Sequence, residues 1–185
     1  PSGLTYGKVN VAERAEIEAA AGFDQLDVLV LCQGTVVYKR GEFAPSGWDH
    51  VMAVNLDSLM ACAMKFHDQL AAAGGSVIIV SSVSGFQANR GNPAYAASKA
   101  GAVSLTKTLG QAWASDGIRV TGLAPGLVDT KLTKVTTEHP DRLRGAMNRI
   151  PVGRLGEPSD MAGAGVFLAS PLAAYVVGQT LVLGG

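Results

Sequence analysis

Four short runs of mainly apolar residues, each followed by a turn residue, are the clearest pattern along the chain. They occupy residues 28–32, 76–80, 119–124 and 179–183, and glycine, serine or proline follows each run within two residues. Runs of this length without polar alternation are typical of strands that are buried on both faces of a sheet. We therefore predict four buried strands.

Segments with helical character separate these strands. Asn92 and Pro93 are typical of a helix N-cap and first turn, and Gly117 is typical of the end of the same helix. Alanine-rich and amphipathic patterns complete the set. We expect helices over residues 12–21, 48–73, 93–116 and 159–169. Because strands and helices alternate, we predict one α/β domain over residues 1–185, with a Rossmann-like, doubly wound, mostly parallel sheet and helices on both faces.

Composition and charge exclude several classes of protein. The chain carries 15 Lys and Arg residues against 15 Asp and Glu residues, and the basic residues are scattered. A nucleic-acid-binding protein usually has a basic excess or stripe, so we expect no nucleic-acid partner. A hydrophobic content of 48% excludes a disordered chain. The apolar runs are far shorter than the roughly 20 residues of a membrane span, so we expect no membrane partner either.

The cysteines and histidines indicate neither a disulfide framework nor a metal site. Cys32 and Cys62 both lie in apolar segments, and no signal peptide is recognisable, so we expect a cytoplasmic protein. His50, His67 and His139 show no metal-ligand spacing with the cysteines. We therefore expect packing or solvated roles for the histidines and no metal.

Tyr95 and Lys99 are the strongest candidates for chemistry. They stand four residues apart in the helix predicted from Pro93, so both side chains leave the same helix face and can share one site. Ser82 follows a predicted strand at the carboxyl edge of the sheet, where open α/β sheets bind ligands. The segment 125–130 follows another strand at the same edge. We predict one site at this edge.

These segments together resemble the short-chain dehydrogenase/reductase family, from Val9 to the end of the chain. The motifs that carry the resemblance occur in the order and spacing of the family: "MAVNLDS" with Asn55, "IIVSSVSG" with Ser82, "YAASK" with Tyr95 and Lys99, and "APGLVDT" over residues 124–130. The segments "PVGRLGEPSDMA" and "GQTLVLGG" also look like family segments.

The resemblance implies an NAD(P)-dependent oxidoreductase that interconverts a secondary alcohol and a ketone. In such an enzyme Tyr95 would be the acid/base, and Ser82 would orient the substrate oxygen. Lys99 would lower the pKa of Tyr95 and bind the nicotinamide ribose, and Asn55 would hold a relay water. This assignment is chemically reasonable, because a phenol with a pKa of about 10 needs a nearby cation to exchange protons near neutral pH. The choice between NAD and NADP stays open.

The resemblance also implies contacts with the cofactor, the substrate and a second subunit. The expected cofactor contacts are Asn10, Val11, Gly34, Tyr95, Lys99, Pro125, Gly126, Val128 and Thr130. We expect Ser84, Gln87 and Asn92 to line the substrate end, and residues 131–149 to form a substrate lid. By the same resemblance, small residues on the helix from Pro93 would pack against a second subunit in a homodimer or homotetramer.

The chain departs from the family pattern at its start. The glycine-rich phosphate loop is absent, and Gly3 and Gly7 imitate only part of it. The first βαβ unit is therefore largely missing, and we expect the sequence to be an N-terminally incomplete piece of a longer reductase, with trimming of the C-terminus also open. Without that unit, the strand over residues 28–31 would form an exposed apolar edge. Cys32 and Gln33 also replace the asparagine and alanine usual before the family's Gly34.

Two other functions stay open. A non-catalytic binding or scaffold domain of the same fold would keep the helices but would not bind a dinucleotide without the phosphate loop. An epimerase or dehydratase of the related extended families shares the Tyr-x-x-x-Lys motif, but such proteins usually carry a larger C-terminal substrate domain. Taken singly, Ser82 and Asn55 are also consistent with ordinary structural roles.

Overall fold

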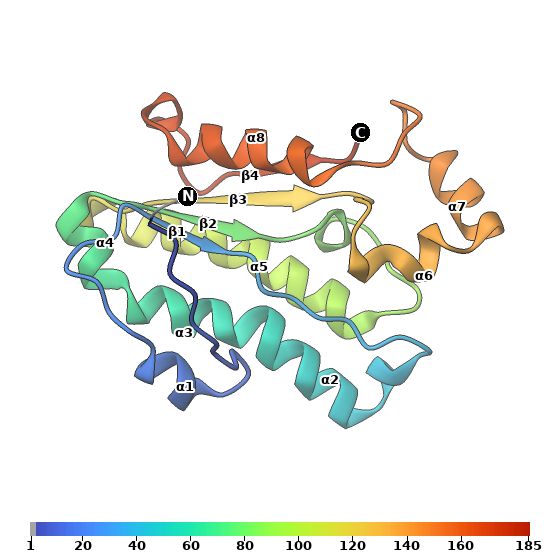
Figure 1. The fold of residues 1–185 in the computed structure, drawn as a ribbon, viewed down its shortest axis with the longest axis horizontal. Helices are drawn as coiled ribbons and strands as arrows, with labels where there is room; N and C mark the ends of the chain where they lie inside the picture. The colour runs from blue at the N-terminus through green and yellow to red at the C-terminus, as the bar shows by residue number, and fades with distance from the viewer. Residues whose placement is uncertain (1–2) are drawn as a thin grey trace.

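A four-stranded parallel sheet forms the centre of the molecule in the computed structural model, which describes residues 3–185 (Figure 1). The strands are β1 (Val28–Leu31), β2 (Ser76–Val80), β3 (Arg119–Pro125) and β4 (Thr180–Leu183), in that order across the sheet. The α-helices are α1 (Arg14–Ala19), α2 (Pro45–Met52), α3 (Ser58–Lys65), α4 (His67–Ala73), α5 (Pro93–Ala112), α6 (Lys134–Thr137), α7 (Pro140–Met147) and α8 (Pro158–Ala169). Strands in register with parallel neighbours confirm the predicted Rossmann-like sheet.

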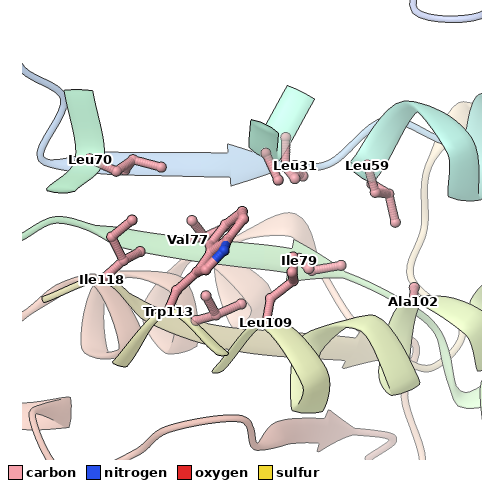
Figure 2. Packing of buried hydrophobic residues seen from close by; sticks show 11 residues of the cluster. Leu31, Leu59, Leu70, Val77, Ile79, Ala102, Leu109, Trp113 and Ile118 are labelled. Carbon is pink, nitrogen blue, oxygen red and sulfur yellow. The ribbon is translucent and has the colours of Figure 1, made fainter. Parts of the chain in front are cut away.

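Helices cover both faces of the sheet. Helices α3, α4 and α5 lie on one face, and α8 lies on the other (Figure 1). On the first face a cluster of buried side chains fills the space between strands and helices, as Figure 2 shows for Val77, Leu109 and Trp113. On the second face Ile78 and Leu123 pack against Leu168 of α8. Alternate residues of β2 therefore enter opposite layers, which explains the apolar run in the sequence.

The long helix predicted over residues 48–73 is interrupted twice. It begins earlier, at Pro45, and widens into one π-helical segment, η2 (Ala53–Asp57). It breaks again at Phe66, whose φ of −108° separates α3 from α4. The apolar spacing that predicted one helix persists through all the pieces.

The remaining boundaries agree with the prediction to within a few residues. Cys32 and Gln179 lie just outside their strands, whereas Pro125 continues β3. Helix α5 ends at Ala112, and the short helix η4 (Ala114–Asp116) continues to Gly117, whose φ of +77° only glycine adopts easily. The segment 131–149 folds into η5 (Lys131–Thr133), α6 and α7.

One side of β1 carries an exposed apolar residue. Strand β1 stands at the end of the strand order and pairs only with β2 within residues 3–185. Val30 is 53% exposed there, as expected for an uncovered edge. In the part of the chain that the structure describes, no helix combines the length and hydropathy needed to cross a membrane.

Candidate active site

A cavity of about 890 Å³ opens at the carboxyl ends of β2 and β3. This is the edge at which parallel α/β sheets bind ligands. The cavity brings together six of the residues predicted from the sequence: Ser82, Ser84, Gln87, Asn92, Tyr95 and Gly126. All three predicted substrate residues therefore lie on its wall. Residues of the predicted lid segment, among them Leu132 and Arg149, line the same cavity.

Tyr95 lies in the first turn of α5 and contributes its side chain to the cavity wall. Burial raises the pKa of its phenol above the ordinary value, and the negative charge of Glu42 acts in the same direction. The nearby Ser82 side chain lowers the pKa but does not offset burial. The phenol is therefore a neutral acid at neutral pH in this chain.

Ser82 is held at the end of β2 by the short helix η3 (Val83–Gly85) that follows it. Its hydroxyl accepts a hydrogen bond from the backbone N–H of Ser84 at 3.1 Å. The neighbouring Ser81 hydroxyl donates to the backbone carbonyl of Lys99 at 2.7 Å. The Ser82 bond caps η3, and the Ser81 bond joins the strand end to α5.

Lys99 stands one turn after Tyr95 and is only 4% exposed. Its ammonium donates one hydrogen bond, 2.9 Å long, to the carbonyl of Val80. Its Nζ lies 5.8 Å from the centre of the Tyr95 ring. Burial lowers the pKa of Lys99 to about 8. The ammonium has three N–H donors, and within residues 3–185 only one of them has a protein acceptor, so two can reach a ligand.

Asn55 lies in the π-helical segment η2 and is fully buried. Its amide accepts from the N–H of Thr35 at 2.7 Å and donates to the carbonyl of Thr35 at 2.9 Å. It also donates to the hydroxyl of Ser98, the residue before Lys99, at 3.2 Å. The Asn55 side chain thus fastens the segment after Gly34 to α5 beside the lysine.

Gly34 lies close to the Lys99 ammonium but does not line the cavity. A Cβ atom at Gly34 would lie 3.4 Å from Nζ of Lys99, so glycine keeps the backbone close to the free ammonium donors. Lys99 and Asn55 also lie outside the cavity lining, whereas Gly126, which follows β3, is part of it.

The other residues expected to contact the cofactor lie outside the lining of the cavity. Pro125 ends β3, Val128 is buried and forms a bridge with Gly156, and Thr130 begins the lid segment with a capping box to Thr133. Asn10 is exposed, and its side chain accepts from the N–H of Ala12 at 3.2 Å. Asn10 and its neighbour Val11 belong to the turn before α1 and do not line the cavity.

Sequence reasoning missed three residues of this site. Glu42 is a buried carboxylate that accepts from the backbone N–H of Tyr95 at 2.9 Å. The hydroxyl of Tyr38 donates to the carbonyl of Leu132 in the lid segment at 2.6 Å. Arg90 lines the cavity together with Arg149 of the predicted lid, and no aspartate or glutamate among residues 3–185 lines it with them. Nothing in their local sequence distinguishes Glu42, Tyr38 and Arg90 from surface residues, because folding brings them together from distant segments.

No cluster of three potential metal ligands occurs among residues 3–185. His67 instead packs against Trp113 and hydrogen-bonds with Asp68 and Asp116. His67 therefore has the packing role expected from the sequence.

Known proteins are similar to this chain both in sequence and in architecture. Residues 7–185 match a family described as enoyl-(acyl carrier protein) reductase. Galactitol 2-dehydrogenase (L-tagatose-forming) of Cereibacter sphaeroides is 37% identical over 186 residues, which cover 98% of this chain and 72% of that enzyme. A 2-dehydro-3-deoxy-D-gluconate 5-dehydrogenase of Pseudoalteromonas atlantica is 37% identical, with coverage of 91% and 67%.

A solved structure of a dehydrogenase has the same fold as this chain. The gluconate 5-dehydrogenase of Burkholderia cenocepacia, crystallised with NADP and tartrate, superposes with a TM-score of 0.89 at 34% identity. The superposition covers 95% of this chain and 71% of that one. Given the family match over almost the whole chain, the chain belongs to the short-chain dehydrogenase/reductase family, whose members are NAD(P)-dependent oxidoreductases.

Proposed function

We propose that the chain interconverts a secondary alcohol and a ketone through Ser82, Tyr95, Lys99 and Asn55. The observation that carries the proposal is the pairing of a phenol on the cavity wall with a buried lysine one helical turn away. A bound NAD or NADP supplies or accepts the hydride, and the chain supplies the proton and the orientation.

Tyr95 is the proton donor in the reducing direction. Its raised pKa keeps the phenol protonated, and the Ser82 hydroxyl on the same cavity wall can hold the substrate oxygen. When the phenol gives its proton to that oxygen, the nearby Lys99 ammonium stabilises the phenolate that remains. In the structure burial has the largest effect on the phenol, and the pKa of Tyr95 is raised. The lowering of this pKa by Lys99 is therefore proposed only for the working enzyme.

Lys99 and Gly34 would hold the nicotinamide ribose, and Asn55 would keep both in place. The bonds of Asn55 to Thr35 and Ser98 support this positioning role. The relay water implied by the resemblance would then pass a proton from Lys99 to solvent. Pro125, Gly126, Val128 and Thr130 would contact the nicotinamide side, and Asn10 and Val11 the adenine end.

A small polar substrate fits the cavity best. Ser84, Gln87 and Asn92 offer hydroxyl and amide groups, and Arg90 and Arg149 add positive charge, with no acidic residue from the described part of the chain on the wall. The named relatives act on a sugar alcohol and on sugar-acid derivatives. We propose a polyhydroxylated substrate and favour one with a carboxylate, because arginine recognises carboxylates well.

The small-residue face of α5 would contact a second subunit in a homodimer or homotetramer. Gly101 and Ser104 of α5 border a shallow hollow with Met60 of α3. Met60 is 39% exposed there and Met64 is 51% exposed, which supports an interface at this place.

Replacing Tyr95 by phenylalanine tests the proposed function. Tyr95→Phe removes only the proton-transfer group, so we expect turnover to fall by at least about a hundredfold. Fluorescence titration with NADH and NADPH should give nearly the same dissociation constants for variant and parent. Rates are measured with a panel of hydroxy acids and neutral polyols.

Serine at position 84 provides the matched control. Ser84→Ala removes a wall hydroxyl outside the proton path, so it should change KM for the substrate more than kcat. Near-normal turnover by Tyr95→Phe would overturn the proposal. A folded parent chain that binds neither nucleotide would favour the scaffold alternative.

A further inference from the structure

Glu42 is a buried carboxylate for which the proposed reaction gives no role. It lies in the short helix η1 (Gly41–Phe43) between β1 and α2 and is 1% exposed. Its Oε1 atom accepts from the N–H of Val37 at 3.1 Å and from the amide of Asn92 at 3.0 Å. Its Oε2 atom accepts from the N–H of Tyr95 at 2.9 Å. Because all three partners are N–H donors, the group is present as a carboxylate.

This carboxylate takes the place of a local helix cap. Asn92 occupies the N-cap position of α5, as the sequence predicts, but its side chain makes no capping bond. The Asn92 amide turns instead to Glu42 and to the carbonyl of Val37. The free N–H of Tyr95 in the first turn is satisfied by Glu42, and the positive end of the helix dipole stabilises the negative charge.

The backbone that carries Glu42 is itself fixed. A Cβ atom at Gly47 in α2 would lie only 2.2 Å from the carbonyl oxygen of Gly41, so α2 presses directly on η1. The same carboxylate joins Val37 and Asn92, which flank or line the cavity, to the backbone of Tyr95. A shift of Glu42 would therefore move the phenol relative to Ser82 on the opposite element.

We propose that Glu42 is the positioning residue of Tyr95: it sets the place of the phenol on the cavity wall and faces the phenol with a negative charge. This inference rests on the proposed function of Tyr95 as the proton donor. Tyr38 after β1 and Glu42 in η1 face the phenol, and Ser82 after β2 and Lys99 on α5 lie beside it. Arg90 and Arg149 line the same cavity. Of these, Lys99 favours phenolate and Glu42 opposes it.

The pKa changes of the two tyrosines support the charge part of the proposal. Burial raises the pKa of Tyr95 most, and the charge of Glu42 raises it further. The pKa of Tyr38 is also raised, first by burial, then by Tyr95 and by Glu42. Both phenols should therefore respond when the charge of Glu42 is removed.

Titration of 3-fluorotyrosine-labelled protein by ¹⁹F NMR tests the proposal without an activity assay. The Tyr95 signal is assigned as the one that disappears in Tyr95→Phe. In Glu42→Gln we expect the Tyr95 midpoint to fall by about half a pH unit or more, because a nearby like charge is removed. Tyr6 and Tyr175 are 88% and 101% exposed and serve as internal references, because Glu42→Gln should leave their midpoints as they are in the parent.

Two further variants separate charge from packing. Glu18→Gln removes an exposed carboxylate on α1 and should leave the Tyr95 signal unchanged. Glu42→Asp keeps the charge but shortens the side chain, so the Tyr95 resonance should be displaced while its midpoint stays high. kcat should fall about tenfold in this variant with little change in the cofactor dissociation constant.

The outcomes distinguish this inference from the proposed function. If the titration midpoint of Tyr95 is the same in folded Glu42→Gln as in the parent, the proposed role of Glu42 is wrong, even if the variant is less stable. If Glu42→Gln does not fold, an unchanged Tyr95 resonance in Glu42→Asp would overturn it instead. Failure of the proposed function would appear separately, as absence of turnover in the parent enzyme with the tyrosine signals behaving as expected.

Discussion

At the scale of single residues, Lys99 is the group in which burial and charge conflict most directly. Its ammonium is 4% exposed and has one protein acceptor, the carbonyl of Val80. Burial lowers its pKa from 10.5 to about 8, so the folded protein releases this proton at lower pH than the unfolded chain. The cost of burying the charge is therefore largest below pH 8 and disappears as the pH approaches 10.5.

Lys99→Met should reveal this cost as a pH-dependent difference in stability. Between pH 7 and pH 10 the parent should gain on the order of 2–3 kcal/mol of unfolding free energy relative to the variant, from a pKa difference of 10.5 − 8 = 2.5. Urea unfolding at both pH values measures it. Lys107→Met, at an exposed position of the same helix, should show no such change. A parallel pH dependence of parent and Lys99→Met would contradict the assignment.

At the scale of elements, α5 carries both Tyr95 and Lys99, and η3 is pressed against it. A Cβ atom at Gly85 would lie 2.7 Å from the carbonyl oxygen of Lys99, a distance that side chains essentially never show. The Ser81 hydroxyl reaches the same carbonyl at 2.7 Å. The relative placement of Ser82 and Tyr95 thus depends on a close approach of two elements.

Gly85→Ala should push η3 away from α5. We expect a loss of about 1–3 kcal/mol in unfolding free energy and a lower kcat, because Ser82 moves relative to the phenol. Urea unfolding and steady-state kinetics measure the two effects. Gly163→Ala in α8, where a Cβ atom meets nothing within 4 Å, should instead be neutral or stabilising by up to about 1 kcal/mol. Equal behaviour of the two variants would contradict this explanation.

At the scale of the whole molecule, two layers of helices enclose the sheet but leave apolar side chains exposed at α3. Met60 borders a hollow with the small residues Gly101 and Ser104 of α5, and Met64, one turn further along α3, is also exposed. Association through this surface would bury them without any change in the fold. The parent should then elute as a dimer or tetramer in multi-angle light scattering.

Ser104→Arg tests this association. The residue is exposed in the single chain, so the variant should keep the circular dichroism spectrum of the parent but shift to a smaller assembly. Ser115→Arg, beyond the end of α5, is the matched control and should keep the parent assembly. If Ser104→Arg elutes with the parent, the interface lies elsewhere.

The sequence by itself determined the four strands and the placement of Tyr95 and Lys99 on one helix face. Both follow from local spacing: apolar runs mark strands, and residues four apart share a helix face whatever surrounds them. The position of Ser82 directly after a predicted strand was also enough to expect it at the carboxyl edge of the sheet, where it lines the cavity.

Only the tertiary structure decided the role of Glu42, the π-helical turn at Asn55 and the two arginines on the cavity wall. Glu42 meets the backbone of a residue 53 positions away, and Asn55 meets Thr35 and Ser98 across two elements. Whether a polar side chain is solvated or buried depends on which distant segments fold over it. That information is absent from any local pattern, because the free energy of the contact arises only when the layers pack.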